Sequence, residues 1–585
     1  MPRQEIRLLG AGVSPGVAIG VAYLVHDDSD EVARYSIAPS QIPEEIGRFE
    51  AALIQTRIQI LEMQQRIAES IGAKDAGIFD AHLLVVEDRT LIDEVLRKLE
   101  TDLCNVEWVF QEVASSYAET LSKIDDPYLR ERALDIQDVT KRVVRNLQGK
   151  APRQFLALTE PHILVAHNLT PSDAAMMNRE RVLGIAIDLG SRTSHTAIMA
   201  RSLNIPAVVG LHDVTSRLET GDSVLVDGMN GVLIINPAPE TEQYYRQVES
   251  KRAHLTERLR ELRETKSTTR DGRHIVLSAN IELPDDVEAV QANGAEGIGL
   301  YRTEFLFLNR SSLPDEEEQY TTYRRVAERV APNPLIIRTF DLGGDKLALD
   351  AVDRPGELNP FLGCRAIRFC LENLDIFRTQ LRAILRASVV GNIKIMFPMI
   401  SGVDELRQAI AVLEECKSEL RKSGAEASGQ TEIGAMVEIP SAAIAADTLA
   451  AEVDFFSIGT NDLIQYAIAV DRVNDRIAHL YQPTHPAVLR LLKMIADAAH
   501  TNQIWVGVCG EMAGDVALIP LLLGLGMDEL SVSAALVPRV KRAVQSLAIP
   551  ECRQLVEESL KLQTPSEILD RCLALANERY GDLLG

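Results

Sequence analysis

Cysteine is scarce in this chain, with seven residues among 585, and none of them forms a Cys-x-x-Cys pair. The lack of such a pair argues against zinc ribbons and thioredoxin-type redox motifs. Scattered thiols are typical of a reducing compartment. The N-terminal stretch MPRQEIRLLGAGVSPG also lacks the sustained apolar segment of an export signal. We therefore expect a cytoplasmic protein.

Long apolar runs and an excess of basic residues are missing as well. A membrane-spanning helix needs roughly 18 apolar residues, and the apolar stretch 516–525 is much shorter and indicates a core helix. The formal net charge is −24, whereas nucleic-acid binding requires a basic patch. These absences predict no membrane insertion and no nucleic-acid partner. The charge by itself is most simply a solvated acidic surface, although it leaves room for a basic partner protein.

The length of the chain predicts three or four domains, at about 100–200 residues each. Residues 1–26 and 153–236 contain short apolar runs separated by turn residues, which indicates one α/β domain with at most a strand pair in 1–26. Residues 33–150 have sparse glycine, and Gly149 is a stop signal at their end. They predict an inserted helical bundle because apolar residues recur there at helical spacing. The stripe comprises Ile46, Phe49, Leu53, Ile60, Met63 and Ile67.

The remaining sequence divides into a linker and a large C-terminal domain. Residues 237–267 are highly charged and predict a connecting helix that acts as a hinge. Residues 268–585 alternate short apolar runs with helical stretches, the pattern of a (β/α)8 barrel of the TIM type. The predicted strands are 275–281, 298–302, 335–339, 393–398, 433–438, 455–458, 505–508 and 529–532.

Chemistry in such a barrel is carried by residues at the carboxyl ends of the strands. Arg302 and Arg338 end neighbouring predicted strands, and Arg365 is a possible third member of the same group. Guanidinium groups match phosphate and carboxylate geometry, so the arginines predict an anion clamp. For any single arginine, a surface salt bridge is the commoner alternative.

Other strand ends carry groups suited to metal binding and proton transfer. Glu438 and Asp462 offer hard oxygen ligands that suit Mg²⁺, although each could instead be a helix cap or an ion-pair partner. Asn461 stands beside Asp462. Cys509 follows an apolar run, and it is either a buried core residue or a candidate acid.

His195, in DLGSRTSHTAIMARS, is the candidate nucleophile. Thr193 and Ser194 are plausible helix caps, which places His195 in a first helical turn, where free backbone N–H groups favour an anion. Imidazole is a good nucleophile near neutral pH. A lone histidine is nevertheless more often a structural hydrogen-bonding residue.

Several segments together resemble enzyme I of the phosphoenolpyruvate:sugar phosphotransferase system, over essentially the whole chain. They are GSRTSHTAIMARSLNIPAVVG, GIGLYRTEFLFL, RTFDLGGDK, NPFLGCRAIR, FFSIGTNDLIQY, AVDR and CGEMAGD, in this order. The resemblance implies a swivelling domain with a phosphohistidine at His195, and a proton donor at Cys509. It also implies Mg²⁺ at Glu438 and Asp462. Phosphoenolpyruvate would be bound by Arg302, Arg338, Arg472 and Asn461.

The resemblance also implies partners. The phosphoryl group would pass from His195 to a histidine-containing phosphocarrier protein (HPr) docked on the helical insert, where His82, Glu87 and Asp88 are expected near the surface. The family's homodimers are joined through the barrel. Ser191 and Val473 stand where glycine is usual, which leaves the functional groups in place.

Two alternatives belong to other functional classes. A dikinase-type enzyme shares the histidine and the barrel, but it needs a nucleotide-binding domain for which this chain has neither the length nor a matching segment. A non-catalytic regulatory homologue would be expected to lack His195, Glu438, Asp462 or Cys509. The nitrogen branch of the family adds an N-terminal sensory domain, and this sequence starts at the α/β domain, which favours the sugar branch.

Overall fold

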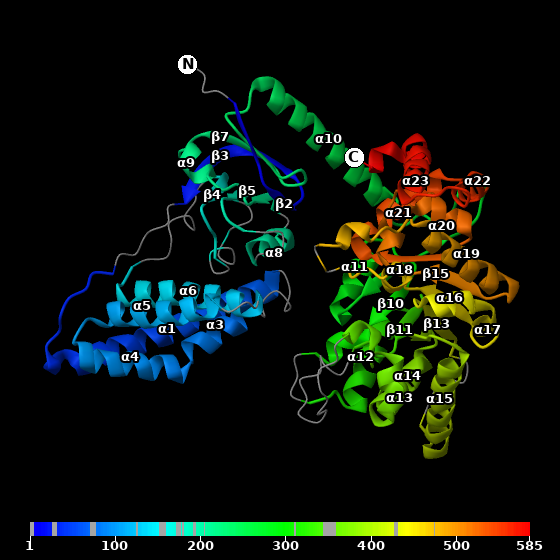
Figure 1. Cartoon of the computed structure of the whole chain (residues 1–585), viewed down its shortest axis with the longest axis horizontal. Coiled ribbons are helices and arrows are strands. Elements are labelled where there is room, and N and C mark those ends of the chain that lie inside the picture. The colour runs from blue at the N-terminus through cyan, green and yellow to red at the C-terminus, as the bar shows by residue number, and fades with distance from the viewer. Residues whose placement is uncertain are drawn as a thin grey trace. The chain divides into compact units, whose positions relative to one another are not determined.

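The computed structural model describes the chain except for residues 1–4, 26–31, 71–77, 124–126, 151–159, 171–172, 174–176, 178–180, 191–194, 204, 309–311, 343–358, 426–430, 473, 475 and 585. The chain forms two compact units, Met1–Arg252 and Ala253–Gly585, each described here by itself (Figure 1). Within the described residues, no helix has both the length and the apolar character needed to cross a membrane.

The first unit contains an eight-stranded mixed sheet in the order β1-β8-β7-β3-β4-β5-β6-β2. The short helices α8 (His195–Ser202) and α9 (Val214–Arg217) belong to the same part of the chain. The strands are β1 (Ile6–Leu9), β2 (Ala11–Ser14), β3 (Val17–Val25), β4 (His162–Ala166), β5 (Val182–Ile187), β6 (Ala207–Val209), β7 (Ser223–Asp227) and β8 (Val232–Ile235).

The expectation of at most one strand pair in residues 1–26 was wrong. Three strands form there, and each pairs with a distant segment: β1 with β8, β2 with β6, and β3 with β4 and β7. The local pattern shows apolar runs, but it does not identify partners far along the chain. The sheet therefore contains strands from before and after the helical insert in the sequence.

The insert is helical, as predicted. Its helices are α1 (Ile42–Ser70), α3 (Ile78–Val86), α4 (Arg89–Asp102), α5 (Val106–Ser122) and α6 (Pro127–Leu147). Phe49, Ile60 and Met63 of the predicted stripe are buried in its core. Thr56 interrupts the stripe without cost, because its hydroxyl donates to the Ala52 carbonyl at 2.8 Å and accepts from Asn146 Nδ2 at 2.8 Å.

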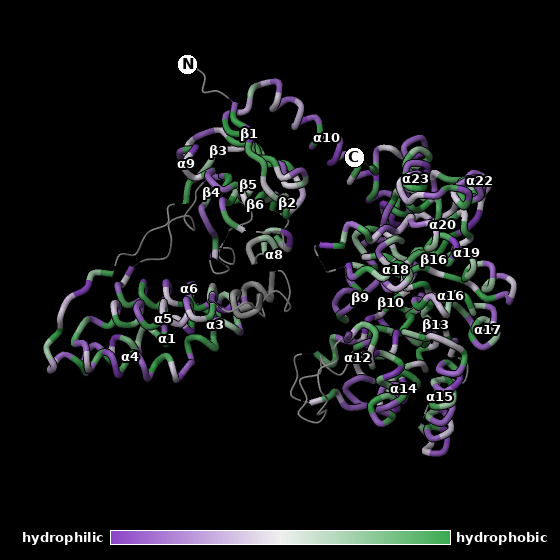
Figure 2. The backbone as a smooth tube through the Cα atoms, in the orientation of Figure 1, coloured by the Kyte–Doolittle hydropathy of each residue, from purple (hydrophilic) through white to green (hydrophobic). Residues whose placement is uncertain are grey.

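Helix α10 (Pro239–Glu261) spans the boundary between the two units and is largely hydrophilic along its length (Figure 2). Its C-terminal part belongs to the second unit, where Leu255 and Leu259 pack against the barrel core. The predicted charged connecting helix therefore has an apolar contact at its barrel end.

The second unit is a closed barrel of eight parallel strands, which confirms the predicted (β/α)8 fold and the multidomain α/β class. The strands are β9 (Val276–Ile281), β10 (Ile298–Arg302), β11 (Leu335–Arg338), β12 (Ile393–Phe397), β13 (Ile433–Val437), β14 (Phe455–Ile458), β15 (Trp505–Val508) and β16 (Glu529–Ser533).

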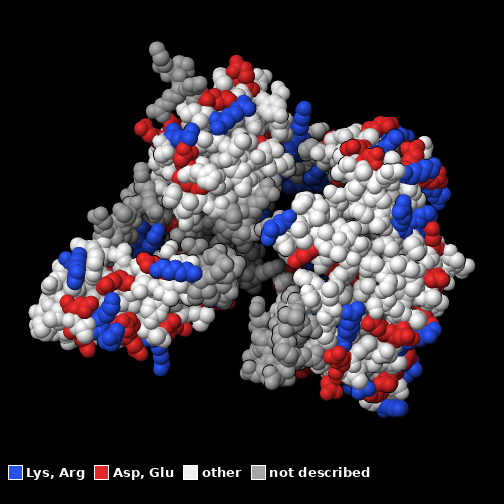
Figure 3. Space-filling view, in the orientation of Figure 1, with Lys and Arg blue, Asp and Glu red and all other residues white. Residues whose placement is uncertain are grey.

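The barrel helices that surround these strands are amphipathic or buried. They are α11 (Val287–Ala292), α12 (Glu316–Val330), α13 (Ile367–Glu372), α14 (Leu374–Ala387), α15 (Val403–Ser423), α16 (Pro440–Ile444), α17 (Ala446–Ala450), α18 (Thr460–Ile468), α19 (Pro486–Thr501), α20 (Ile519–Leu525), α21 (Val537–Ser546), α22 (Ile549–Ser559) and α23 (Pro565–Tyr580). On the face drawn in Figure 3, acidic and basic side chains are interspersed over this unit.

The barrel interior is filled by side chains and is not a pore. Leu300, Ile336, Met396, Met436, Phe455 and Cys509 form one buried cluster inside it. Phe455 fits because position 434 is glycine: a Cβ there would lie 2.2 Å from the Phe455 ring. Cys509 belongs to this apolar interior and also faces the cavity at the carboxyl end of the strands.

Candidate functional site

The carboxyl ends of the barrel strands surround a cavity of about 490 Å³. Arg302 and Arg338 are the last residues of β10 and β11, while Glu438 and Cys509 directly follow β13 and β15. The structure brings together around this cavity every barrel residue that the sequence had singled out: Arg302, Arg338, Arg365, Glu438, Asn461, Asp462, Arg472 and Cys509.

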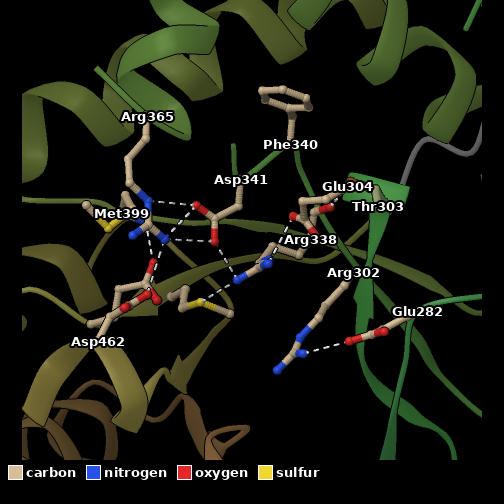
Figure 4. A network of polar contacts seen from close by, with 12 residues as sticks. Glu282, Arg302, Thr303, Glu304, Arg338, Phe340, Asp341, Arg365, Met399 and Asp462 are labelled. Carbon is tan, nitrogen blue, oxygen red and sulfur yellow. Dashed lines mark hydrogen bonds and ion pairs between the residues drawn. The ribbon is translucent and has the colours of Figure 1, made fainter. Parts of the chain in front are cut away.

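Arg338 lies between Glu304 and Asp341 in a buried charge network (Figure 4). Its Nη1 is 2.7 Å from Asp341 Oδ2, and its Nη2 is 2.9 Å from Glu304 Oε1. Burial opposes the charged guanidinium, but the two carboxylates outweigh it and hold the pKa of Arg338 above its usual value. Arg338 is therefore a fixed cation, and the surface salt bridge considered from the sequence does not describe it.

Asp341 connects this arginine to a second one. Arg365 Nη2 lies 3.0 Å from Asp341 Oδ1 and 3.3 Å from Asp462 Oδ2. The pKa of Arg365 is also raised, because the nearby carboxylates of Asp341 and Asp462 outweigh the effect of burial. The network thus continues from the end of β11 to the first turn of α18 (Figure 4).

Two further arginines pair with more exposed carboxylates nearer the solvent. Arg302 Nη1 is 3.0 Å from Glu282 Oε1, and Arg472 Nη1 is 3.1 Å from Glu511 Oε1. Asn461 Nδ2 donates to the same Glu511 oxygen at 3.2 Å. The cavity therefore has buried cations on its inner side and more exposed cations at its mouth, an arrangement that suits a small polyanion.

Glu438 and Asp462 lie in a concentration of negative charge that bears on metal binding. Burial and the charges of Asp462 and Asp341 raise the pKa of Glu438 well above its ordinary value. One Glu438 oxygen accepts the Met399 N–H at 2.6 Å. Asp462 lies inside the first turn of α18 and not at its N-cap, Gly459. A bound cation would relieve this concentration of negative charge, so the pair fits a metal.

The type of metal site follows from the small number of protein ligands. Among the described residues, no group of three or more histidine, cysteine, aspartate or glutamate side chains is arranged to hold an ion. Two carboxylates suit a hard cation that keeps waters and takes substrate oxygens, which is the usual binding mode of Mg²⁺.

Cys509 is a buried thiol at the edge of the cavity. Burial raises its pKa to about 11, although a hydrogen bond with Ser457 acts in the opposite direction. Its Sγ donates to the Ile458 carbonyl at 3.6 Å. The thiol therefore stays protonated at neutral pH, as a proton donor must be. Its position next to the arginines separates it from an ordinary core cysteine.

His195 belongs to the other unit, where it is the first residue of α8. The predicted caps Thr193 and Ser194, and also Ser191, lie outside the described residues, as does Val473 in the barrel. The C-terminal part of α8 is anchored by buried Met199 and Ala200, and the Ser14 hydroxyl donates to the Ala200 carbonyl at 3.2 Å. These contacts fix the C-terminal part of α8, and His195 stands at its N-terminal end.

The expected surface position of His82 was wrong. His82 is buried, with its Nε2 3.3 Å from Asp135 Oδ1 and its ring edge-to-face with Phe79. It faces α6, where carboxylate oxygens of Asp135 and Asp138 lie 3.3 and 4.0 Å from its Nε2. Glu87 and Asp88 are exposed: Glu87 pairs with Arg57 at 2.7 Å, and Asp88 caps α4.

Sequence reasoning missed the carboxylates that pair with the arginines: Glu282, Glu304, Asp341 and Glu511. A usable signal was present, because Glu282 follows β9 and Asp341 lies three residues after Arg338. The strand-end argument applied to the arginines covers these acids equally.

The fold and the cavity together define a (β/α)8-barrel enzyme with a site for a small polyanion. Comparison with known proteins identifies its family. Three consecutive family descriptions match: "PEP-utilising enzyme, N-terminal" over residues 9–132, "PEP-utilising enzyme, mobile domain" over 158–231, and "PEP-utilising enzyme, PEP-binding domain" over 256–549.

Curated relatives resemble the chain over nearly its full length. The phosphoenolpyruvate-protein phosphotransferase of Bacillus sp. (strain S) is 48% identical over 566 residues, which cover 97% of each chain. Those of Geobacillus stearothermophilus and Bacillus subtilis (strain 168) are 47% and 46% identical, and the matches cover 97% of this chain and 97% and 98% of theirs. The chain belongs to the phosphoenolpyruvate-utilising enzyme family, in the branch of the phosphoenolpyruvate-protein phosphotransferases.

Proposed function

We propose that the protein transfers the phosphoryl group of phosphoenolpyruvate to its own His195, releases pyruvate, and passes the phosphoryl group to a histidine-containing phosphocarrier protein, the first step of phosphotransferase-system sugar uptake. The observation that carries this proposal is the barrel cavity, in which fixed arginines, a carboxylate pair and a protonated thiol converge. The names of the relatives support the same activity.

Substrate binding is assigned to the guanidinium and amide groups of the cavity. Arg302, Arg338 and Arg472 supply charge for the phosphoryl and carboxylate groups, and Asn461 donates to the phosphoryl oxygens. Arg338 is already held by Asp341 and Glu304, so little reorganisation accompanies binding. Phosphoryl transfer depends chiefly on such positioning and charge stabilisation.

Glu438 and Asp462 are the proposed ligands of Mg²⁺. The ion, when bound, neutralises charge on the transferring phosphoryl group. Arg365 fixes the orientation of the Asp462 carboxylate through its contact at 3.3 Å, and the Met399 N–H fixes that of Glu438 at 2.6 Å. Both carboxylates are therefore oriented by neighbouring groups of this chain.

His195 and Cys509 carry out the phosphoryl transfer and the proton transfer, and water restores the thiol. A ring nitrogen of His195 forms a bond to phosphorus as the bond from phosphorus to the enol oxygen breaks. The electron pair leaves with the enolate, and Cys509 delivers its thiol proton to the methylene carbon to give pyruvate. Water returns a proton to the thiolate, because Cys509 lines the open cavity.

The nucleophile and the substrate site belong to different compact units, and we propose that a domain motion brings His195 to the barrel. The proposed hinge is residues 237–267, which contain helix α10. His195 is the first residue of α8, and a helix N-terminus suits an anion such as a phosphorylated imidazole.

The proposed docking surface for the carrier protein is the exposed face of α1 and α3. Two polar links connect α1 to this segment: Arg57 pairs with Glu87, directly after α3, and Gln64 donates to Asp80 of α3. Leu61 and Leu84 fall between the links at helical spacing and remain 37% and 64% exposed. An apolar surface with acidic neighbours suits a protein partner.

We further propose a cytoplasmic homodimer joined through the barrel. All seven cysteines are free thiols, as expected in a reducing compartment. Exposed Ile444, Leu480 and Met494 are candidates for burial between barrel units. Sedimentation with and without Ile444→Asp tests the dimer.

A rapid-quench assay of pyruvate formation tests the proposed activity. Without a carrier protein, one chain should release about one pyruvate from phosphoenolpyruvate and Mg²⁺, and His195→Ala should release none. Labelled ATP should leave the protein unlabelled, since labelling by ATP would indicate a dikinase.

A further inference from the structure

The Glu511 carboxylate contacts two of the groups assigned to the substrate phosphoryl group. Its Oε1 accepts from Asn461 Nδ2 at 3.2 Å and from Arg472 Nη1 at 3.1 Å. Both donors therefore converge on one anionic oxygen. This is the geometry that a phosphoryl oxygen would need at the same place.

The backbone of Glu511 has a separate contact. Its N–H donates to Asn461 Oδ1 at 2.9 Å, which leaves the Asn461 amide nitrogen directed at the carboxylate. This backbone contact does not depend on the Glu511 side chain. Removing the negative charge should therefore leave the orientation of Asn461 unchanged.

The main chain at this point has little freedom to move. A Cβ on Gly510 would lie 2.0 Å from Thr460 Oγ1 and 2.8 Å from Thr460 N, so the two segments are in close contact. A 3₁₀ turn, Glu511–Gly514, starts immediately afterwards. Displacement of the carboxylate is therefore a side-chain rotation and does not require the loop to open.

The exposure of this ion pair makes it weak. The Glu511 and Arg472 side chains are 80% and 40% exposed, whereas those of Arg338 and Asp341 are 11% and 3% exposed. Exposed pairs contribute about 0.2–1 kcal/mol, while breaking a buried pair is far more costly. An incoming phosphoryl dianion can therefore replace the exposed Glu511 carboxylate, but it cannot replace a buried partner such as Asp341.

We propose that Glu511 is a positioning residue that occupies the phosphoryl subsite as an internal substrate mimic. It holds Arg472 and the Asn461 amide in their binding orientation, and it rotates away when phosphoenolpyruvate enters. The inference rests on the proposed function, because it takes Asn461 and Arg472 as phosphoryl ligands. Its consequence is a competition that weakens apparent substrate affinity without taking part in chemistry.

Glu511→Gln tests this competition, because it removes the charge and keeps the shape. The variant should lower the KM for phosphoenolpyruvate by about 1.5- to 5-fold, the range for an exposed ion pair, and leave kcat unchanged. In a His195→Ala background, which cannot turn over, calorimetry should give a dissociation constant lower by the same factor.

Asp515→Asn is the matched control. Asp515 is exposed and lines the neighbouring cavity together with Glu511, but its side chain accepts a hydrogen bond from the Ala517 N–H at 2.9 Å. Its substitution removes the same charge from the same mouth and should leave KM unchanged.

An active wild type whose Glu511→Gln variant has an unchanged or higher KM, or a lower kcat, overturns the inference. An equal fall in KM for both variants would also overturn it, since the loss of any negative charge near the cavity would then explain the result. Failure of the proposed function looks different, because the wild type itself would form no pyruvate.

Discussion

Arg338 and Asp341 form a buried ion pair, with 2.7 Å between Nη1 and Oδ2. Asp341 also receives Arg365 at 3.0 Å through its other oxygen. One aspartate thus orients two guanidinium groups on the inner wall of the cavity. Because this arrangement is fixed by the fold, the cations face the substrate position before anything binds.

Substitution of Arg338 should therefore lower catalytic activity severely even when the positive charge is retained. Arg338→Lys loses the planar fork that contacts Asp341 and Glu304, and kcat/KM for phosphoenolpyruvate should fall by at least about 100-fold. Arg407→Lys is the control, since Arg407 on α15 pairs with Glu452, neither residue lines the cavity, and the substitution should change kcat/KM little. Comparable losses in both variants would contradict the role given to the inner network.

Metal binding should depend on Glu438 and on pH. Mg²⁺ alone should raise the melting temperature of the wild type, and Glu438→Gln should abolish that rise. Because the pKa of Glu438 is raised well above its ordinary value, protonation competes with the ion at higher pH than it would for an ordinary glutamate, and the rise should shrink as pH falls. Glu452→Gln should keep the full effect. A rise that persists in Glu438→Gln would place the metal elsewhere.

The Cys509 thiol should lose its proton only at unusually high pH. With a pKa of about 11, it is neutral below that pH and becomes thiolate only as pH rises through it. Alkylation of Cys509, followed by peptide mass mapping, should therefore accelerate about tenfold per pH unit from 8 to nearly 11. A plateau near pH 9 would indicate an ordinary thiol.

Loss of that thiol should affect chemistry more than binding. Cys509→Ala should lower kcat by about 10²- to 10⁴-fold with little change in substrate affinity, as expected for a lost proton donor. Cys416→Ala removes a buried thiol from α15 and should leave kcat near the wild-type value. Retained pyruvate formation in Cys509→Ala would assign the proton to another group.

The face of α1 and α3 should matter only for the second transfer. Leu84→Glu places a charge in the exposed apolar surface, so transfer from the phosphorylated protein to the carrier should slow by at least about tenfold, while self-phosphorylation continues. Met229→Glu changes an exposed apolar side chain on a turn of the sheet and should leave both steps unaffected. Slower self-phosphorylation in Leu84→Glu would indicate damage to the fold instead.

The barrel was readable from the sequence because buried parallel strands are short continuous apolar runs. The predicted strands 298–302, 455–458 and 505–508 coincide with β10, β14 and β15. The cavity followed because the carboxyl ends of such strands meet at one mouth. Local pattern and topology together were sufficient at these positions.

Features that depend on contacts between residues far apart in the sequence could not be predicted in this way. The first strands pair with segments far along the chain, and His82 turns inward toward carboxylates on α6. Glu511 follows a strand-end cysteine, but its two partners come from α18 and the segment after it. Sequence spacing alone does not reveal which side chains will meet.

The most direct test of the central claim uses phosphoenolpyruvate with a labelled phosphoryl group, Mg²⁺ and the purified chain, followed by mapping of the label. We predict one acid-labile, base-stable adduct on His195, with pyruvate released in equal amount. Label taken up by the His195→Ala variant, or pyruvate formed without labelled protein, would contradict the account.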